Sequence, residues 1–412
     1  MVESQIKVIK AGRLIDGTGA APVENATVII ENGKFKRVGQ NIPVPEGAQI
    51  IDAAGKTVMP GMIDAHMHCN GPRIEDTYQD TISRPRELRL IKAINDTRDY
   101  LLAGFTTVKA CGGMNGVFLK RAVAEGTVTG LPRIFSTSYS LSNTIGNFHS
   151  YMPEEDVDAR TSKHTGHPGG LCLICDGVDE CIKATRYALI RGADFVKIWA
   201  RGSCLNPDEL KAIVQTAEEA DKFVSIHTEN SKIAEKAIIA GVKTIDHATG
   251  VEDKAVEMGN KAGVVFVSTL ICLEAIIKCG PKVGRSIQEL EWAKRFLEVS
   301  CLSYRKIRKL GGIMAIGTDY GAESLVQELG SSAIELELLV KYCDFTPMEA
   351  IVAATKNGAM ACFMEDKTGT IEPGKFADII IVDGDPLADI KILQDREKIK
   401  IVMLEGKVEI ER

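Results

Sequence analysis

The stretch Pro60-Gly-Met-Ile-Asp-Ala-His-Met-His68 places two histidines two residues apart, directly after the apolar run Thr57-Val-Met59. Residues i and i+2 of a strand point to the same face, so His66 and His68 can bind one metal ion together. A His-x-His pair alone is a weak metal signal. Other ligands must therefore come from elsewhere in the chain.

The chain beyond this stretch repeats one junction, in which a helical pattern ends at a glycine and a β-rich run begins at once. Glycine readily takes the left-handed conformation that closes a helix, so each copy predicts a helix followed by a strand. With strands near residues 58–65, 132–137 and 222–227, the copies give eight strands. That alternation predicts an α/β fold, a (β/α)8 TIM barrel whose strands are all parallel. The junctions are Ala103-Gly-Phe-Thr-Thr-Val108, Arg191-Gly-Ala-Asp-Phe-Val196, Ala240-Gly-Val-Lys-Thr-Ile245, Ala262-Gly-Val-Val-Phe-Val267 and Gly311-Gly-Ile-Met-Ala-Ile316.

One predicted helix carries both a start signal and a core-facing stripe. Asn206-Pro207 supplies a capping side chain followed by a proline suited to the first helical position. The apolar residues behind it recur at the i, i+3, i+4, i+7 spacing of a helix that buries one face. They are Leu210, Ile213, Val214 and Ala217.

Both ends of the chain consist of short β-rich runs joined by turns. Asn32-Gly33 has the sequence of a type I′ hairpin turn. We predict that residues 1–57 together with 367–412 form one composite β-sandwich domain, and that residues 58–366 form the catalytic barrel. The runs are 6–10, 27–31, 34–38, 377–382 and 399–404.

The composition bounds the class of protein. The chain has 45% apolar and 26% charged residues, which is the composition of a soluble globular protein. A formal charge of −6, without basic runs interleaved with aromatics, argues against a nucleic-acid partner. The N-terminus lacks the apolar core of a signal peptide, and the longest apolar stretch, 262–277, is too short and too interrupted to span a bilayer. We therefore expect a cytoplasmic protein without a membrane partner.

The eleven cysteines are scattered and odd in number, which predicts reduced thiols. Cys172, Cys175 and Cys181 form the one tight group. We interpret them as core and loop thiols, with a structural zinc site or a redox pair as the alternative.

Four ligand-type or ionisable residues end later predicted strands: Lys197, His227, His247 and Asp319. Barrel enzymes keep their chemistry at the carboxyl ends of the strands, so these side chains and the two histidines of the first strand are expected to meet. Six such residues at one mouth predict a metal site. The alternatives are an ion-paired lysine at Lys197 and a turn or helix-capping aspartate at Asp319.

Five segments carry this set: Gly61-Met-Ile-Asp-Ala-His-Met-His68, Phe195-Val-Lys197-Ile, His227, His247 and Gly317-Thr-Asp319. Together they resemble the metal-dependent amidohydrolase superfamily. The flanks Gly12-Arg-Leu-Ile-Asp-Gly-Thr-Gly19 and Gly369-Thr-Ile-Glu-Pro-Gly-Lys-Phe-Ala-Asp378 are similar to its accessory β domain, so the resemblance covers nearly the whole chain. Gly104-Phe-Thr-Thr-Val108 and Asp176-Gly-Val-Asp-Glu180 most resemble the prolidase-like and imidazolonepropionase-related branch, which includes dipeptidases and other amide hydrolases.

The resemblance implies a role for each strand-end residue. In binuclear members, the residues matching His66, His68 and Asp319 hold one divalent metal ion, and those matching the two later histidines hold the other. A carboxylated lysine matching Lys197 bridges them, because an ammonium cannot bind a metal whereas a carbamate can. We expect two metal ions, zinc in identity, and a carbamate on Lys197.

The function implied is hydrolysis of an amide bond in a small dipeptide or N-acyl amino acid-like substrate by a hydroxide that bridges the metals. Asp319, beside the hydroxide, would take its proton and pass it to the leaving amine. We further expect a small-molecule substrate as the partner and a homo-oligomeric assembly.

Three residues are candidates for substrate contacts. His149 aligns with a histidine segment that contacts substrate in related dipeptidases, although Asn147 and Phe148 replace small residues there. Some relatives have an aromatic residue where this chain has Glu229, and a carboxylate there would repel a substrate carboxylate. Arg201 is a candidate for the missing positive charge, with a solvated loop arginine as the alternative. His164 and His167 suggest either a surface metal site or a polar loop.

Two alternative functions remain open. A mononuclear deaminase or cyclic-amide hydrolase on the same barrel would use a glutamate three residues after the strand-five histidine, where this chain has Asn230, and would leave Lys197 without a role. A catalytically silent barrel scaffold is the other alternative. Such scaffolds lose metal ligands, whereas this chain retains all six.

Overall fold

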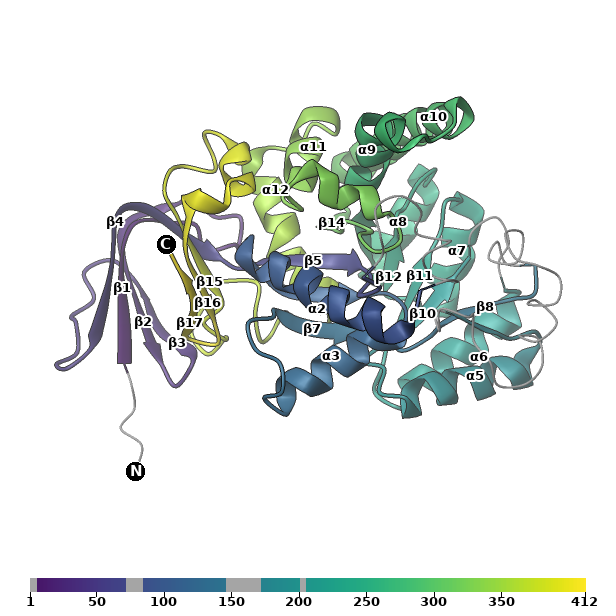
Figure 1. Cartoon of the computed structure of the whole chain (residues 1–412), viewed down its shortest axis with the longest axis horizontal. Coiled ribbons are helices and arrows are strands. Elements are labelled where there is room, and N and C mark those ends of the chain that lie inside the picture. Colours follow the sequence, from purple (N-terminus) through teal and green to yellow (C-terminus); the bar gives the residue numbers. More distant parts are fainter. Residues whose placement is uncertain (1–5, 72–83, 146–171, 201–204) are drawn as a thin grey trace.

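The computed structural model describes residues 6–71, 84–145, 172–200 and 205–412. Figure 1 shows two parts: a β-rich part drawn in purple and yellow, the colours of the two ends of the chain, and a larger part in which strands and helices alternate. The N-terminal and C-terminal segments thus lie side by side although they are more than 300 residues apart in sequence.

The β-rich part is one mixed sheet of seven strands in the order β17-β16-β15-β4-β1-β2-β3. The long strand β4 joins the two ends, because it pairs in parallel with β1 and antiparallel with β15. Both ends therefore contribute strands to one sheet. The predicted domain bounds and the sandwich form of this part stay predictions. The strands are β1 (Ile6–Leu14), β2 (Val23–Glu31), β3 (Lys34–Gly39), β4 (Gln49–Pro60), β15 (Ile379–Val382), β16 (Ile399–Leu404) and β17 (Lys407–Glu411).

The turn between β2 and β3 confirms the predicted hairpin. Asn32 and Gly33 have φ angles of 53° and 77°, and Glu31 pairs with Lys34 across the turn. Positive φ at both central residues is the requirement of a type I′ turn, which asparagine and glycine meet with little strain.

The larger part contains parallel sheets of three and seven strands, in the orders β5-β6-β7 and β14-β13-β12-β11-β10-β8-β9. All pairings within them are parallel, as expected for strands that alternate with helices. The strands are β5 (Met62–Met67), β6 (Phe105–Ala110), β7 (Arg133–Ser136), β8 (Ser140–Ser142), β9 (Cys172–Ile174), β10 (Val196–Trp199), β11 (Val224–His227), β12 (Thr244–Asp246), β13 (Val265–Ser268) and β14 (Ile313–Ile316).

Hydrogen bonds link the three-stranded sheet to the seven-stranded one on both of its sides. On one side the Asp194 N–H donates to the Ser136 carbonyl oxygen at 2.7 Å. On the other, the N–H groups of Thr318 and Asp319 donate to the His66 carbonyl oxygen at 3.0 and 2.8 Å. The arrangement is compatible with a TIM barrel flanked by a second β domain.

Two details differ from the sequence prediction. The strand expected at 58–65 is divided at Gly61: Val58 belongs to β4, and β5 starts at Met62. A Cβ at Gly61 would lie 2.1 Å from the Thr106 hydroxyl oxygen, so the chain crosses close to β6 at this point. The prediction also missed β8 and β9, because strands of three residues carry too little periodicity to be recognised.

Helices follow most of the parallel strands, and the predicted glycine junctions are confirmed. Gly104, Gly192, Gly241, Gly263 and Gly311 all have φ between 67° and 100°. The helices are α2 (Arg86–Leu102), α3 (Met114–Ala124), α5 (Val178–Ile190), α6 (Pro207–Glu218), α7 (Ser231–Ala240), α8 (Asp253–Ala262), α9 (Leu270–Cys279), α10 (Ile287–Lys309), α11 (Ile334–Tyr342), α12 (Pro347–Ala354) and α13 (Lys356–Ala361), with 3-10 turns η2 (Gly280–Val283), η3 (Ser324–Leu329), η4 (Ile390–Gln394) and η5 (Arg396–Lys398).

Helix α6 begins as predicted. The Asn206 side chain accepts from the N–H groups of Asp208 and Glu209, and Glu209 reaches back to the Asn206 N–H, which completes a capping box. The predicted stripe of Leu210, Ile213, Val214 and Ala217 is buried. Within the described parts of the chain, no helix combines the length and apolarity needed to cross a bilayer.

Candidate metal centre

Strands β5 and β14 bring three ligand-type side chains together. His66 lies near the end of β5, His68 follows that strand, and Asp319 follows β14. The Nε2 atoms of the two histidines lie 3.2 and 3.3 Å from Oδ1 of Asp319. Asp319 adopts a left-handed φ of 53° and donates its N–H to the His66 carbonyl oxygen, which fixes the carboxylate against the strand. These donors are typical zinc ligands and lie close enough to share one ion.

A second pair of histidines lies beside the first. His227 ends β11 and His247 follows β12, and their ring centroids are 4.1 Å apart. The His247 ring is also 4.6 Å from that of His66, so the two pairs adjoin. His247 Nδ1 lies 2.8 Å from the Thr269 hydroxyl. When Nδ1 donates to that hydroxyl, Nε2 keeps its lone pair for a metal.

Lys197 on β10 also reaches this cluster, and its side chain is almost completely buried. In this structure its ammonium donates to the Asp246 carboxylate, so the side chain lies in the ion-paired arrangement that the sequence analysis kept as the alternative. The bridging role stays a prediction.

Asp246, at the end of β12, is buried and contacts several residues of the cluster. Its Oδ2 accepts from the Ser225 hydroxyl at 2.7 Å and lies 3.1 Å from His66 Nδ1. Burial alone would raise the pKa of Asp246, but the ammonium groups of Lys197 and Lys109 hold it well below its usual value. The ionised carboxylate thus faces Nδ1 of His66 at ion-pair distance, while Nε2 is directed at Asp319.

The protonation states of two of the histidines, His68 and His247, suit metal ligands. Burial lowers the pKa of His66, but Cys111 and Asp246 outweigh it and raise that pKa well above its usual value. Burial, reinforced by His227, lowers the pKa of His247 well below its usual value, and burial also lowers the pKa of His68. Both imidazoles are therefore neutral near pH 7, as metal binding requires. His68 Nδ1 is buried without a hydrogen bond to any residue that the structure describes. The donor set therefore fits divalent metal ions.

Asp64 anchors the first ligand group from behind. Its carboxylate accepts from the His66 N–H at 3.0 Å and from the Thr318 N–H and hydroxyl at 3.2 and 2.6 Å. Burial raises the pKa of Asp64 to about 6, against the hydrogen bonds from Thr318 and His66. The Tyr100 hydroxyl lies 2.7 Å from that of Thr318. Because Thr318 donates to Asp64, Tyr100 donates to Thr318.

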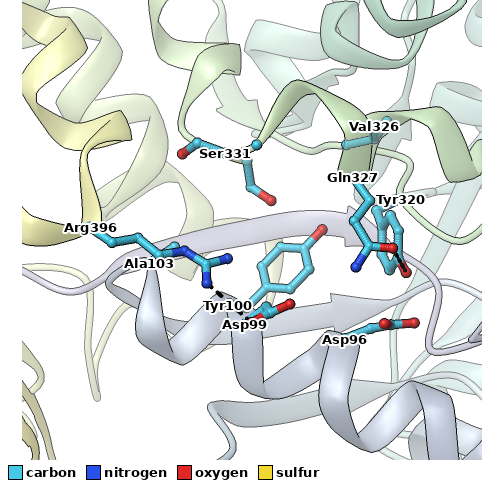
Figure 2. Close-up of a pocket in the computed structure, with 11 residues that line it drawn as sticks. Asp96, Asp99, Tyr100, Ala103, Tyr320, Val326, Gln327, Ser331 and Arg396 are labelled. Atoms are coloured by element: carbon cyan, nitrogen blue, oxygen red, sulfur yellow. Dashed lines mark hydrogen bonds and ion pairs between the residues drawn. The ribbon is translucent and has the colours of Figure 1, made fainter. Parts of the chain in front are cut away.

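Two cavities lie among the described residues, and both are away from the candidate metal centre. Figure 2 shows the Tyr100 ring reaching from α2 into a pocket that Tyr320, Ser331 and Arg396 also line. Its volume of about 50 Å³ is too small for a dipeptide. A cavity of about 550 Å³ lies beside Phe223, which precedes β11, and thus at the strand ends opposite the histidines.

The substrate-contact predictions are only partly visible. His149, His164 and His167 fall in 146–171, and Arg201 falls in 201–204, all outside the described residues. Glu229 lies at the cluster, with Oε1 3.5 Å from His227 Nε2. The described cysteines, Cys172, Cys175 and Cys181 among them, are all buried free thiols.

Asn230, the position of the glutamate expected in a mononuclear deaminase, serves a structural purpose. Its side chain accepts from the N–H groups of Lys232 and Ile233 and caps the start of α7. The deaminase alternative therefore gains no acidic group from this position.

Glu335 on α11 supports the second histidine pair through α9. Its buried carboxylate accepts from the Leu270 and Ile271 N–H groups at 3.0 and 2.7 Å, at the start of the helix that Thr269 precedes. Burial raises the pKa of Glu335 from 4.5 to about 7. Because this pKa is higher in the folded than in the unfolded protein, protonation of Glu335 favours the folded state. That contribution to the unfolding free energy is complete below pH 4.5 and is lost as the pH rises through 7.

We therefore expect a pH-dependent difference between the wild type and Glu335→Gln. The wild-type unfolding free energy should fall by about 3 kcal/mol relative to the variant between pH 4.5 and 8. Chemical denaturation across this range measures both. Parallel pH curves for the two proteins would refute the shifted pKa.

The chain matches one protein family and is similar to several known proteins over most of its length. A model described as the amidohydrolase family matches residues 57–408. An ochratoxinase from Aspergillus niger is 29% identical over 98% of this chain and 87% of its own length. An imidazolonepropionase from Thermoplasma volcanium is 22% identical over 95% of this chain and 92% of its own.

Solved structures agree with these matches. The crystal structure of the A. niger ochratoxinase superposes with a TM-score of 0.87 at 26% identity, covering 99% of this chain and 96% of that one. The structure of a prolidase complexed with N-methylphosphonate-L-proline gives 0.86 at 26% identity, covering 99% and 100%.

Proposed function

This chain belongs to the amidohydrolase family and is a hydrolase of carbon–nitrogen bonds, and on that premise we propose that it cleaves the amide bond of a small dipeptide or N-acyl amino acid-like substrate with two divalent metal ions. The observation that carries the proposal is the convergence of two histidine pairs and Asp319 at the carboxyl ends of β5, β11, β12 and β14. We also propose that the two parallel sheets close into the (β/α)8 barrel.

The proposed centre divides its ligands between two ions, zinc in identity. His66, His68 and Asp319 would hold one, and His227 and His247 would hold the other. Lys197, as a carbamate, would be the ligand shared by both. When bound, such ions lower the pKa of water toward neutrality and polarise the scissile carbonyl.

The chain's own residues orient and protonate the reactants. Asp319, held between the two imidazoles of His66 and His68, accepts the proton of the attacking water on its carboxylate and returns it to the leaving amine. Its pKa is held well below the usual value by hydrogen bonds from these histidines, which outweigh its burial, so the carboxylate is ionised, as a metal ligand must be. Asp246 and Thr269 keep the rings of His66 and His247 aligned.

The substrate class is proposed from the relatives together with Glu229. A prolidase, an Xaa-Pro dipeptidase and an ochratoxinase are among the solved relatives above 25% identity. Glu229 beside His227 places a negative charge where a substrate carboxylate would be repelled. We therefore propose that Glu229 weakens the binding of a substrate that has a free carboxylate near it.

Glu229→Gln is expected to improve binding of carboxylate-bearing substrates. Removing one like charge should lower KM for such a substrate by about fivefold, which corresponds to ~1 kcal/mol. The matched control is the same substrate with its carboxylate converted to a neutral amide, whose KM should stay constant. Equal KM changes for both substrates would show that charge repulsion is not the cause.

The proposed function is tested by purifying the chain without chelator, measuring metal per chain, and screening Xaa-Pro dipeptides and N-acyl amino acids. We expect about two metal ions per chain and hydrolysis that chelation abolishes and zinc restores. About one ion, with ammonia release from a cyclic or aromatic amine, would favour the deaminase instead. Full metal occupancy without hydrolysis of any amide would favour the scaffold.

A further inference from the structure

Lys109 on β6 is a fully buried cation that the proposed chemistry does not use. Its ammonium donates to the Thr244 hydroxyl at 3.0 Å and to the Ser225 hydroxyl at 3.3 Å, and it lies over the Phe195 ring, 4.7 Å from the centroid. Burying a lysine in such a place is costly unless an opposite charge compensates. The compensating group is Asp246, whose Oδ1 lies 4.0 Å away.

Two directed hydrogen bonds connect Lys109 to Asp246, which in turn contacts the first ligand histidine. Lys109 donates to Ser225, and the Ser225 hydroxyl donates in turn to Oδ2 of Asp246 at 2.7 Å. A hydroxyl can accept one hydrogen bond while donating another, so both contacts coexist. The same Oδ2 lies 3.1 Å from Nδ1 of His66. The cation thus reaches the imidazole through two intermediate groups.

We propose that Lys109 is a positioning residue of the metal centre, which holds Asp246 in the orientation that fixes the His66 ring. This inference rests on the proposed function. Asp246 has two lysine neighbours here, Lys197 and Lys109. Lys197 cannot bind a metal while it remains an ammonium paired with Asp246, because an ammonium has no lone pair. In the metal-bound protein, Lys109 is therefore the ammonium that stays with Asp246.

The charges of the cluster support this assignment. Asp246 is completely buried, and a buried carboxylate that loses its cationic partners is strongly destabilising. Two lysines lie within ion-pair distance of Asp246 among the described residues, so Lys109 is the one that stays when Lys197 serves the metal ions as an anion. Without it, Asp246 would retain the Lys197 ammonium, and Lys197 would stay away from the metal ions.

The test compares metal affinity in Lys109→Met, which keeps most of the side-chain length but removes the charge, with that of the wild type. Both proteins are stripped with a chelator and titrated with Zn²⁺ against a competing indicator, and the Co²⁺ absorption spectrum is recorded. We expect about tenfold weaker zinc binding, the usual effect of replacing a residue that supports a metal ligand from behind, and an altered Co²⁺ spectrum. A folded Lys109→Met with wild-type zinc affinity and Co²⁺ spectrum overturns the proposal.

Two further variants keep the outcome decisive. Lys120→Met removes another lysine–aspartate pair, 2.7 Å from Asp194 and outside the metal cluster, and should lower stability without changing zinc affinity. Ser225→Ala interrupts the hydrogen-bond chain and decides the matter if Lys109→Met does not fold: weaker zinc binding supports the proposal, and unchanged binding overturns it.

A wild type that binds one ion contradicts the binuclear function, while its affinity relative to Lys109→Met still tests Lys109.

Discussion

Replacing Asp319 with asparagine is expected to lower kcat/KM for amide hydrolysis on the order of 10⁴-fold. Asparagine fits the same space and tolerates the left-handed φ of 53°, so the fold should persist. It removes the carboxylate that we propose as a ligand of the first metal ion and as the acceptor of the proton of the attacking water. The rate is measured on whichever amide substrate the wild type cleaves best, with metal content determined in parallel.

Asp344 offers the matched control. It also has a left-handed φ, 60°, but lies on the surface and pairs with Arg305 at 3.3 Å. Asp344→Asn should retain wild-type kcat/KM. If Asp319→Asn loses less than about tenfold while binding its full complement of metal, Asp319 is not the proton acceptor.

Replacing Lys197 with alanine is expected to remove both metal binding and activity. The methyl group cannot carry a carbamate, so the bridge between the ions is lost. Metal content should fall from about two ions per chain to one or fewer, and kcat/KM on the order of 10³-fold. Added bicarbonate and metal should not restore either quantity, because no amine remains to be carboxylated. Elemental analysis and steady-state kinetics measure the two effects.

Lys120→Ala controls for the loss of a lysine–aspartate pair as such, since Lys120 pairs with Asp194 away from the cluster. It should keep its metal ions. Unchanged metal stoichiometry in Lys197→Ala would show that Lys197 serves as the structural partner of Asp246 in the ion pair seen here.

The sequence predicts the elements of this fold well where a local signal is strong. The glycine junctions, the Asn32-Gly33 hairpin and the capped start of α6 are all confirmed, because each depends on backbone preferences of one or two residues. The amidohydrolase resemblance, and its prolidase-like and imidazolonepropionase-related branch, are confirmed by the family match and the relatives. The strand-end rule also predicted which distant histidines would meet.

The groups behind the metal cluster were missed. Asp64 and Asp246 lie two residues and one residue before a predicted ligand histidine, inside otherwise apolar strands, and a carboxylate in such a run was the available signal. No sequence signal marks Lys109 and Tyr100, because their importance depends on contacts with residues more than 100 positions away. The division of the first strand at Gly61 likewise depends on the approach of β6.

The central claim is that His66, His68, His227, His247, Lys197 and Asp319 form one binuclear centre. An anomalous difference map, recorded at the zinc edge on crystals of the zinc-loaded protein, tests it most directly. We predict two peaks about 3.5–4 Å apart, one against the first three-residue group and one against the second histidine pair, with Lys197 between them. A single peak, with Lys197 still paired to Asp246, would contradict the account.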